Sequence, residues 1–366
     1  FHLINTADEL SVSSSLGIRN MVYEGCAMGN IGSEFVYMPK DDGTHYVNGN
    51  LVCNDREVGM LEGTYNTVNS SIDAKLDLNR TPLSLVNGFI PQQLIGLKGT
   101  GEGTLTVKGN IEKPEIDGEV FLDSAYLVSV PYGVELRFDN DPVRIVGSHL
   151  LFENFEMYAH NNSPLTMVGD LDFSNPSRMM LNLKMRAENY QIIDAKENLR
   201  SEDCGKAVVN VFALLNGPLD DLSMRGKLDV LGATDMTYVL RDSPLPTDNQ
   251  LDGLVKFTDL NDSIEEVVNR PAPTGLNMDM TVNVDQAAHI VCALNADQSN
   301  YIDLEGEGTL RMQYNTVDGL QLRGRYTLNN GQMKYSLPVI PLKTFTIQDG
   351  SYVEFRGDPM NPYLNI

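Results

Sequence analysis

Apolar or small residues alternate with polar residues without a break from Ile302 to Tyr314. A period of two over this length predicts one long β-strand with one apolar face, because successive side chains of a strand point to opposite sides. At about 3.3 Å per residue the strand would extend roughly 40 Å, about twice the length of an ordinary globular strand. The apolar side of this strand carries Ile302, Leu304, Gly306, Gly308, Leu310, Met312 and Tyr314.

The same alternation recurs along the chain, with turn signals between the alternating runs. It is found in residues 181–188, 222–230, 278–284 and 320–328. The turn signals are Asp42-Gly43, Asn175-Pro176, Asn216-Gly217-Pro218, Asp318-Gly319, Asn330-Gly331 and Asp349-Gly350. Such pairs between alternating runs are strong hairpin signals, so we expect an all-β, mainly antiparallel sheet. Strand-turn-strand units at 103–122, 209–231 and 308–328 form a loose repeat, which is typical of a sheet that grows by adding hairpins.

Helix signals are few. Asn261–Asn269 has a cap-like start and ends before Pro271, which predicts a short helix, and 189–200 is a weaker candidate. We therefore expect one or two short helices.

Glycines recur in phase with the apolar residues of several strands. Gly306 and Gly308 share the phase of Leu304 and Leu310, and Gly226 shares that of Met224. Glycine costs a strand about 0.5–1 kcal/mol against alanine, so its placement needs a reason. One interpretation is that glycines let a tall sheet curve and leave volume for a ligand; the other is that they mark bulges or a tight contact between two packed sheets. On the first interpretation, leucine at position 306 would obstruct the groove and leave the strand intact.

Composition narrows the class of partner. The 366 residues include 27 Lys and Arg against 50 Asp and Glu, a net charge of −23, which disfavours a nucleic-acid groove or an anionic membrane surface. No apolar stretch approaches the roughly 20 residues of a membrane-spanning helix. Because the sequence begins and ends in strand-like segments, we expect a fragment of a longer protein. Its four cysteines, Cys26, Cys53, Cys204 and Cys292, are expected to be free thiols, with a Cys26–Cys53 bridge as the alternative.

Catalytic motifs are missing from the sequence. The five histidines lie far apart, and there is no G-x-S-x-G nucleophile motif, Walker loop or zinc-ligand spacing. Gly99-Thr-Gly-Glu-Gly103 leads into a strand, whereas a phosphate-binding loop leads into a helix N-terminus. We expect no enzyme activity, no cofactor and no metal site.

Several motifs in the last part of the chain resemble the C-terminal region of TamB proteins. They are Gly324-Arg-Tyr326, the segment Lys343-Thr-Phe-Thr-Ile-Gln-Asp-Gly-Ser351, Gly357-Asp-Pro359 and Leu364-Asn-Ile366. Gly169–Pro176 and Met185–Tyr190 also resemble this family, and Phe355 stands where many members have tryptophan. The resemblance is clear over residues 95–366, while residues 1–94 share only the general character of the family's sequences. It suggests two segments: 1–94, an N-terminal β segment of the same groove, and 95–366, a TamB C-terminal-like region.

The resemblance implies an elongated, curved β-taco with an apolar concave groove and no catalytic residues. It further implies a periplasmic protein of Gram-negative bacteria, anchored to the inner membrane in its full-length form, with an outer-membrane barrel of TamA or BamA type as partner. Such a protein would form a bridge for phospholipid between the two membranes. The alternatives are an assembly factor for outer-membrane β-barrels and a purely structural β-sandwich or adhesin. The expected lipid-binding groove residues are Leu105, Val107, Ile116, Val120, Leu183, Met185, Met224, Leu228, Leu304, Gly306, Gly308, Leu310, Met312, Leu322 and Tyr326.

Overall fold

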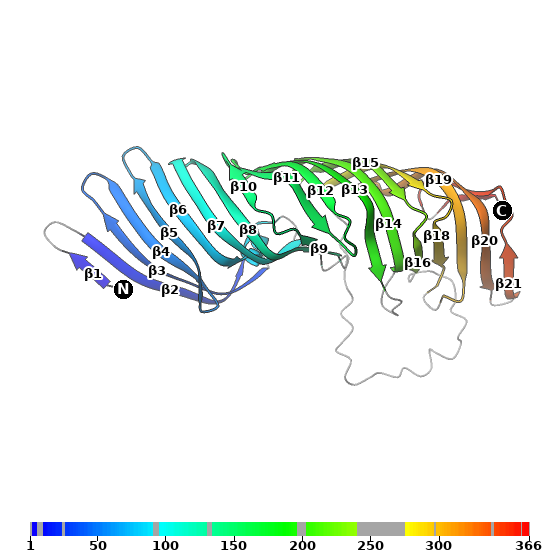
Figure 1. Cartoon of the computed structure of the whole chain (residues 1–366), viewed down its shortest axis with the longest axis horizontal. Coiled ribbons are helices and arrows are strands. Elements are labelled where there is room, and N and C mark those ends of the chain that lie inside the picture. Colours follow the sequence, from blue (N-terminus) through cyan, green and yellow to red (C-terminus); the bar gives the residue numbers. More distant parts are fainter. Residues whose placement is uncertain are drawn as a thin grey trace, which may run out of the picture. The chain divides into compact units, whose positions relative to one another are not determined.

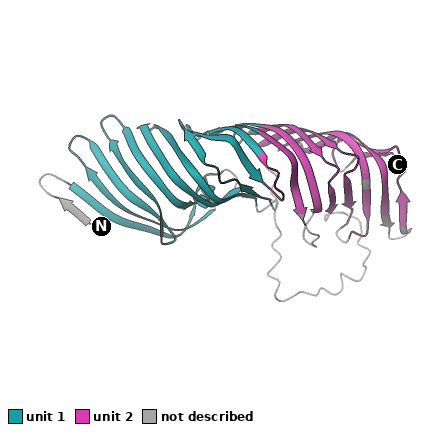
Figure 2. Cartoon of the chain, in the orientation of Figure 1, with its two compact units in different colours: residues 1–158, 166–184, 215–222 teal, residues 159–165, 185–214, 223–366 magenta. Residues whose placement is uncertain are grey.

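The computed structural model of the chain describes residues 2–5, 10–23, 26–90, 95–129, 134–195, 203–239, 275–295, 298–337, 340–359 and 361–365. It is 77% strand and 2% helix, which confirms the all-β class. The chain divides into two compact units (Figure 2). Unit 1 comprises Phe1–Tyr158, Thr166–Lys184 and Leu215–Leu222, and unit 2 comprises Ala159–Leu165, Met185–Leu214 and Ser223–Ile366.

Unit 1 is an antiparallel array in which each strand from β1 to β8 pairs with the next one along the chain (Figure 1). Its strands are β1 (His2–Asn5), β2 (Leu10–Tyr23), β3 (Cys26–Pro39), β4 (Thr44–Cys53), β5 (Arg56–Asn66), β6 (Ser71–Pro82), β7 (Gly96–Asn110), β8 (Lys113–Ser129), β9 (Val134–Phe138), β10 (Val143–Val146) and β11 (His149–Tyr158). Both β9 and β10 pair with β8 and with β11, so together they form one interrupted strand between these two neighbours.

A short 3-10 helix, η1 (Leu83–Phe89), is inserted between β6 and β7. It begins directly after Pro82, and Asn87 fixes it to β7: the Asn87 side chain accepts from Leu97 N at 2.7 Å and donates to Leu97 O at 3.1 Å. The absence of a Cβ at Gly88 allows it to lie against Tyr23 of β2. Beyond this insertion β6 pairs with β7 from Ser71 to Pro82, so hydrogen bonding continues across the expected 94/95 boundary; the division there stays a prediction.

Strands β12 (Leu165–Asp172), β13 (Met180–Ala195), β14 (Asp203–Pro218) and β15 (Leu222–Val230) contribute residues to both units. The remaining strands belong to unit 2. They are β16 (Asp235–Val239), β17 (Leu276–Val284), β18 (His289–Ala293), β19 (Tyr301–Asn315), β20 (Gly319–Leu337), β21 (Ile340–Thr346), β22 (Ser351–Gly357) and β23 (Tyr363–Asn365). The long strand expected at 302–314 is confirmed as β19, which pairs with β20 along its whole length.

β16 and β18 of unit 2 pair in parallel, from Asp235 opposite His289 to Val239 opposite Ala293. Parallel neighbours cannot be joined by a tight turn, because the chain must cross back to the starting end of the sheet. The predicted helix Asn261–Asn269 falls in the sequence between these two strands and lies outside the described residues.

The helix expected at 189–200 is wrong for its described part, because β13 continues as a strand through Ala195. A bulge explains the misleading pattern. Asn189 adopts a positive φ of 52°, and its amide donates to the Asn210 side chain at 2.8 Å. The bulge shifts the phase of alternation, so that Ala187 and Tyr190 are both buried although they are three residues apart. A spacing of three resembles helical periodicity.

Two of the six turn signals do not mark hairpins. Asn330-Gly331 lies inside β20, where a register shift opposite Glu305 and Gly306 marks a bulge. Asp349-Gly350 is a turn, but β21 and β22 both pair antiparallel with β20 and so run in the same direction. The turn therefore separates two parts of one interrupted strand.

All four cysteines are free, as expected. The alternative bridge does not fit the register, since Cys53 stands opposite Ile31 of β3, five positions beyond Cys26. Five residues of strand span about 17 Å, whereas the Cα atoms of a disulfide lie at most about 7 Å apart.

Candidate functional site

The apolar face of unit 1 is a continuous row of side chains across neighbouring strands. Residues directly opposite each other in a sheet share a face, so the strand register alone identifies the residues of this row. It runs through Phe35, Gly49, Leu61, Leu76, Leu105, Gly118 and Ile145, one from each of the strands β3 to β8 and β10. Two glycines interrupt the large side chains of the row, and six strand spacings give it a length of about 29 Å.

Four expected groove residues lie together on the apolar face of unit 1. Val107 stands opposite Ile116, and Val120 stands opposite Gly103, on either side of the Leu105 row. All four side chains, including Leu105, are half-buried, and Leu61 of the same row is 40% exposed. In the described part of unit 1, this face is therefore not sealed in the way that a closed core would be.

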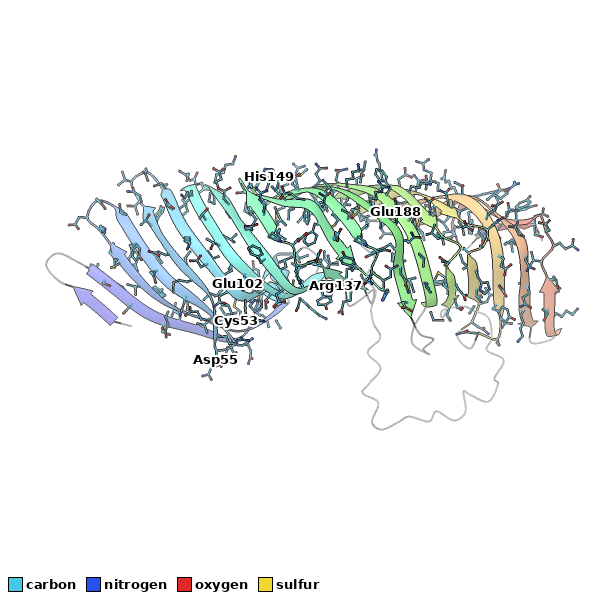
Figure 3. All side chains as sticks on the ribbon, in the orientation of Figure 1. Cys53, Asp55, Glu102, Arg137, His149 and Glu188 are labelled. Atoms are coloured by element: carbon cyan, nitrogen blue, oxygen red, sulfur yellow. The ribbon has the colours of Figure 1, made fainter. Side chains whose placement is uncertain are left out.

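The opposite face of the same strands is polar. Lys75 on β6 forms an ion pair with Asp77 at 2.7 Å, and the Thr104 hydroxyl on β7 donates to Asp77 at 2.6 Å. The bond from Lys75, followed by that from Thr104, lowers the pKa of the exposed Asp77. Glu102, labelled in Figure 3, is exposed on this polar face. The two faces of unit 1 thus differ in chemistry: one is apolar and partly exposed to solvent, and the other is charged and solvated.

The apolar face of unit 2 is built in the same way from β17, β19, β20 and β22. Its rows are Met280–Met312–Leu322–Gly357, Val282–Leu310–Gly324–Phe355 and Val284–Gly308–Tyr326–Val353. This face brings together the expected residues Gly308, Leu310, Met312, Leu322 and Tyr326. The expectation missed Met280, which is 5% exposed, although the alternation of 278–284 could have found it.

A segment of unit 2 itself packs on part of the apolar face of unit 2. Ile347, in the segment between β21 and β22, packs with Tyr326, Leu328 and Val353 in one core cluster. Leu328 is 1% exposed and Val353 9%. The apolar face of unit 2 is therefore more closed than that of unit 1 at this point.

The other expected groove residues are less closely grouped. Leu183 is buried in unit 1, while Met185, two residues along β13, is half-buried in unit 2. Met224 and Leu228 are half-buried on β15, where Gly226 between them lies against Ala213 of β14. Leu304 stands opposite Gly331 of β20 by register.

The two glycines of β19 lie in close contact with the backbone of the neighbouring strand β20. A Cβ added to Gly306 would overlap the carbonyl oxygen of Thr327 on β20, and one added to Gly308 would lie 2.5 Å from Arg325 O. The expectation that leucine at position 306 would leave the strand intact is therefore wrong. Gly306 does lie at a register shift between β19 and β20, as the bulge interpretation expects. The close contact, however, is between neighbouring backbones of one sheet and not between two packed sheets.

A polar concavity of about 560 Å³ is the other candidate site, in unit 2. It is lined by Ser223, Met224, Arg225, Asn277, Met278, Asp279, Gln313, Tyr314, Asn315, Asp318, Gln321 and Arg323. Its carboxylate Asp279 already accepts hydrogen bonds from two guanidinium nitrogens of Arg311, at 2.7 and 2.8 Å, which lowers the pKa of Asp279. No group of three or more potential metal ligands occurs among the residues that the structure describes.

Comparison with protein families gives one match. The model of the TamB C-terminal domain matches residues 153–366. The chain belongs to the TamB family. Comparison with curated proteins and with solved structures gives no match.

TamB proteins are envelope proteins of Gram-negative bacteria, work with TamA-type partners in the outer-membrane translocation and assembly module, and are not a known enzyme family. Within the described part of this TamB chain, none of the helices has the length and hydropathy needed to span a bilayer. The match begins at residue 153, so the resemblance of 95–152 to TamB stays a prediction.

The TamB motif Gly324-Arg-Tyr326 places a buried tyrosine on the apolar face of unit 2. Tyr326 is 6% exposed, burial raises its pKa to about 12, and its hydroxyl has no hydrogen-bond partner among the described residues. A hydroxyl buried without a partner costs about 1–3 kcal/mol.

We expect Tyr326→Phe to increase the free energy of unfolding by about 1 kcal/mol, because it removes an unpaired polar atom and keeps the ring. Urea unfolding followed by circular dichroism would measure the change. Tyr46→Phe is the control, since the Tyr46 hydroxyl donates to Glu62 at 3.0 Å and its loss should leave stability unchanged or slightly lower. A destabilised Tyr326→Phe protein would show that the hydroxyl has a partner.

Proposed function

We propose that the apolar faces of the two units hold the acyl chains of phospholipid, as parts of a periplasmic bridge that moves phospholipid between the inner and outer membranes. The observation that carries the proposal is the half-open apolar row of unit 1, from Phe35 to Ile145. At about 29 Å it exceeds the roughly 15 Å that acyl chains occupy in one leaflet of a bilayer. The anchor in the inner membrane and the barrel of TamA or BamA type are parts of the same proposal.

The half-exposure of this face suits transport better than storage. Burying one CH₂ group yields about 0.8 kcal/mol, so full enclosure of a sixteen-carbon chain would yield roughly 12 kcal/mol and make release slow. A face on which Leu105 and Val107 are half-buried and Leu61 is 40% exposed would cover only part of each chain. Neighbouring positions along such a row offer similar binding energy, which favours movement between them.

Leu61 and Met60 allow a matched test of the proposal. They are adjacent, apolar and similarly exposed, at 40% and 45%. Leu61 stands between Gly49 and Leu76 on the apolar face, whereas Met60 stands between Asn50 and Asp77 on the polar face. A photo-crosslinking residue at Leu61 should capture phospholipid in cells, and one at Met60 should capture little. Equal capture at both positions, or none at Leu61, would reject the proposal.

A second function, in the assembly of outer-membrane barrels, is favoured by the edge of β2. Residues 14–23 of β2 pair with β3, and β1 covers Leu10 to Ser13. Among the described residues no second strand pairs with Leu16 or Ile18, which are 63% and 56% exposed. A strand edge of this kind can accept a strand from another protein. In that case crosslinks from Leu16 would go to protein, and the Leu61 position would capture no lipid.

A further inference from the structure

His289 joins three neighbouring strands of unit 2. It lies on β18, and its Nδ1 is 2.8 Å from an oxygen of Asp235 on β16, while its Nε2 is 2.8 Å from an oxygen of Asp303 on β19. Ionised carboxylates only accept hydrogen bonds, so both ring nitrogens donate, and only the protonated imidazolium carries two N–H groups. The geometry is that of a positive charge held between two negative ones.

These contacts lie at the parallel pair of strands. The register of β16 and β18 covers five residue pairs, starting at Asp235 opposite His289, whereas β19 and β20 share fifteen. No hairpin connects β16 to β18, but β16 also pairs with β14, β18 with β19, and β15 with β17. The His289–Asp235 contact is a charged bond across this junction, at the end where β18 begins.

Other charged groups around the ring are mostly negative. On β19, Glu305 stands opposite His289, and on β14, Lys206 stands opposite Asp235. On β20, the Gln332 side-chain amide is 3.4 Å from the second oxygen of Asp303. The bond to Asp235, followed by that to Asp303, raises the pKa of His289 against the opposing effect of burial.

We propose that His289 is a proton-controlled clamp that holds β16 against β18 when it is protonated and releases this junction when it is neutral. A neutral imidazole has one N–H group, so it can donate to one of its two carboxylates only. The Asp303 side chain is 23% exposed and the Asp235 side chain 77%. The bond to the more buried Asp303 is the one retained, and the contact across the parallel junction is lost.

The direction of the pH effect follows from the raised pKa. His289 binds its proton more tightly in the folded than in the unfolded state. The contribution of the clamp to folding stability is therefore complete below the ordinary histidine pKa of about 6.5. It is lost as the pH rises through the pKa of the folded state. The junction is therefore expected to be tighter in mildly acidic than in mildly alkaline solution.

Hydrogen exchange at about pH 5.5 and 8.5, corrected for intrinsic rates, would test the clamp in the intact chain. We expect protection of residues 235–239 to fall roughly threefold at the higher pH, the scale of a partly exposed ion pair, while the β18–β19 amides change less. His289→Gln should abolish this pH dependence. His160→Gln is the matched control, because His160 is exposed in the same unit and its ring has no hydrogen bond or ion pair to any described residue.

Equal pH dependence in the wild-type and His289→Gln proteins would overturn the proposal. If His289→Gln does not fold, NMR titration of the wild-type ring decides instead. A midpoint for His289 above that of His160 supports the clamp, and a midpoint equal to or below that of His160 overturns it.

Discussion

Replacing Gly306 by alanine is expected to lower the free energy of unfolding of unit 2 by about 3 kcal/mol or more. The added methyl group would overlap the carbonyl oxygen of Thr327 on the neighbouring strand. Backbone atoms of a strand inside a sheet cannot move aside as the end of a flexible side chain can. Either the β19–β20 pairing opens locally or the whole unit shifts, and both outcomes lose ladder hydrogen bonds.

Two control variants separate this clash from a general effect of alanine. Gly17→Ala makes the same chemical change on β2, where the nearest atom to the new Cβ is Ile31 O at 3.9 Å, so it should stabilise by about 0.5 kcal/mol. Glu307→Ala alters the exposed residue next to Gly306 and should change stability by less than about 0.5 kcal/mol. Urea unfolding followed by circular dichroism measures all three. A Gly306→Ala protein as stable as the Glu307→Ala protein would contradict the close-contact interpretation.

The strands could be predicted from the sequence because their signal is local. Alternation from Ile302 to Tyr314 fixes both the strand and its apolar face, and Asp318-Gly319 fixes the hairpin that follows. Neither requires knowledge of the rest of the chain. The same alternation identified the apolar-face residues of β7, β8, β19 and β20, because phase within a strand decides the face.

Features that depend on distant segments could not be predicted in this way. Asn330-Gly331 has the composition of a hairpin turn, but it forms a bulge because β20 continues past it to pair with β21. The parallel pairing of β16 with β18 brings together Asp235 and His289, which are 54 residues apart in the sequence, and it leaves no periodic trace in either strand. The exposure of Leu61 and the burial of Leu328 likewise depend on what covers each face.

The apolar row of unit 1 should lose its lipid when a charge is placed in it. Leu61→Asp puts a carboxylate between Gly49 and Leu76, where an acyl chain would have to pass. Placing an ionised aspartate in hydrocarbon costs about 2.5–3.5 kcal/mol, which corresponds to a roughly 100-fold loss of lipid at that point. Because Leu61 is 40% exposed, the free protein can hydrate the new carboxylate and should still fold.

Lipid captured by a photo-crosslinking residue at Leu105, two strands away in the same row, measures this loss. Met60→Asp is the matched variant, with the same charge on the neighbouring residue and on the polar face, and it should leave capture at Leu105 unchanged. Circular dichroism of both proteins confirms that the sheet is intact. Equal losses in the two variants would mean that charge anywhere on β5 is harmful, and undiminished capture in Leu61→Asp would mean that lipid does not follow this row. Only a difference between adjacent residues of similar exposure supports a path set by one face of the sheet.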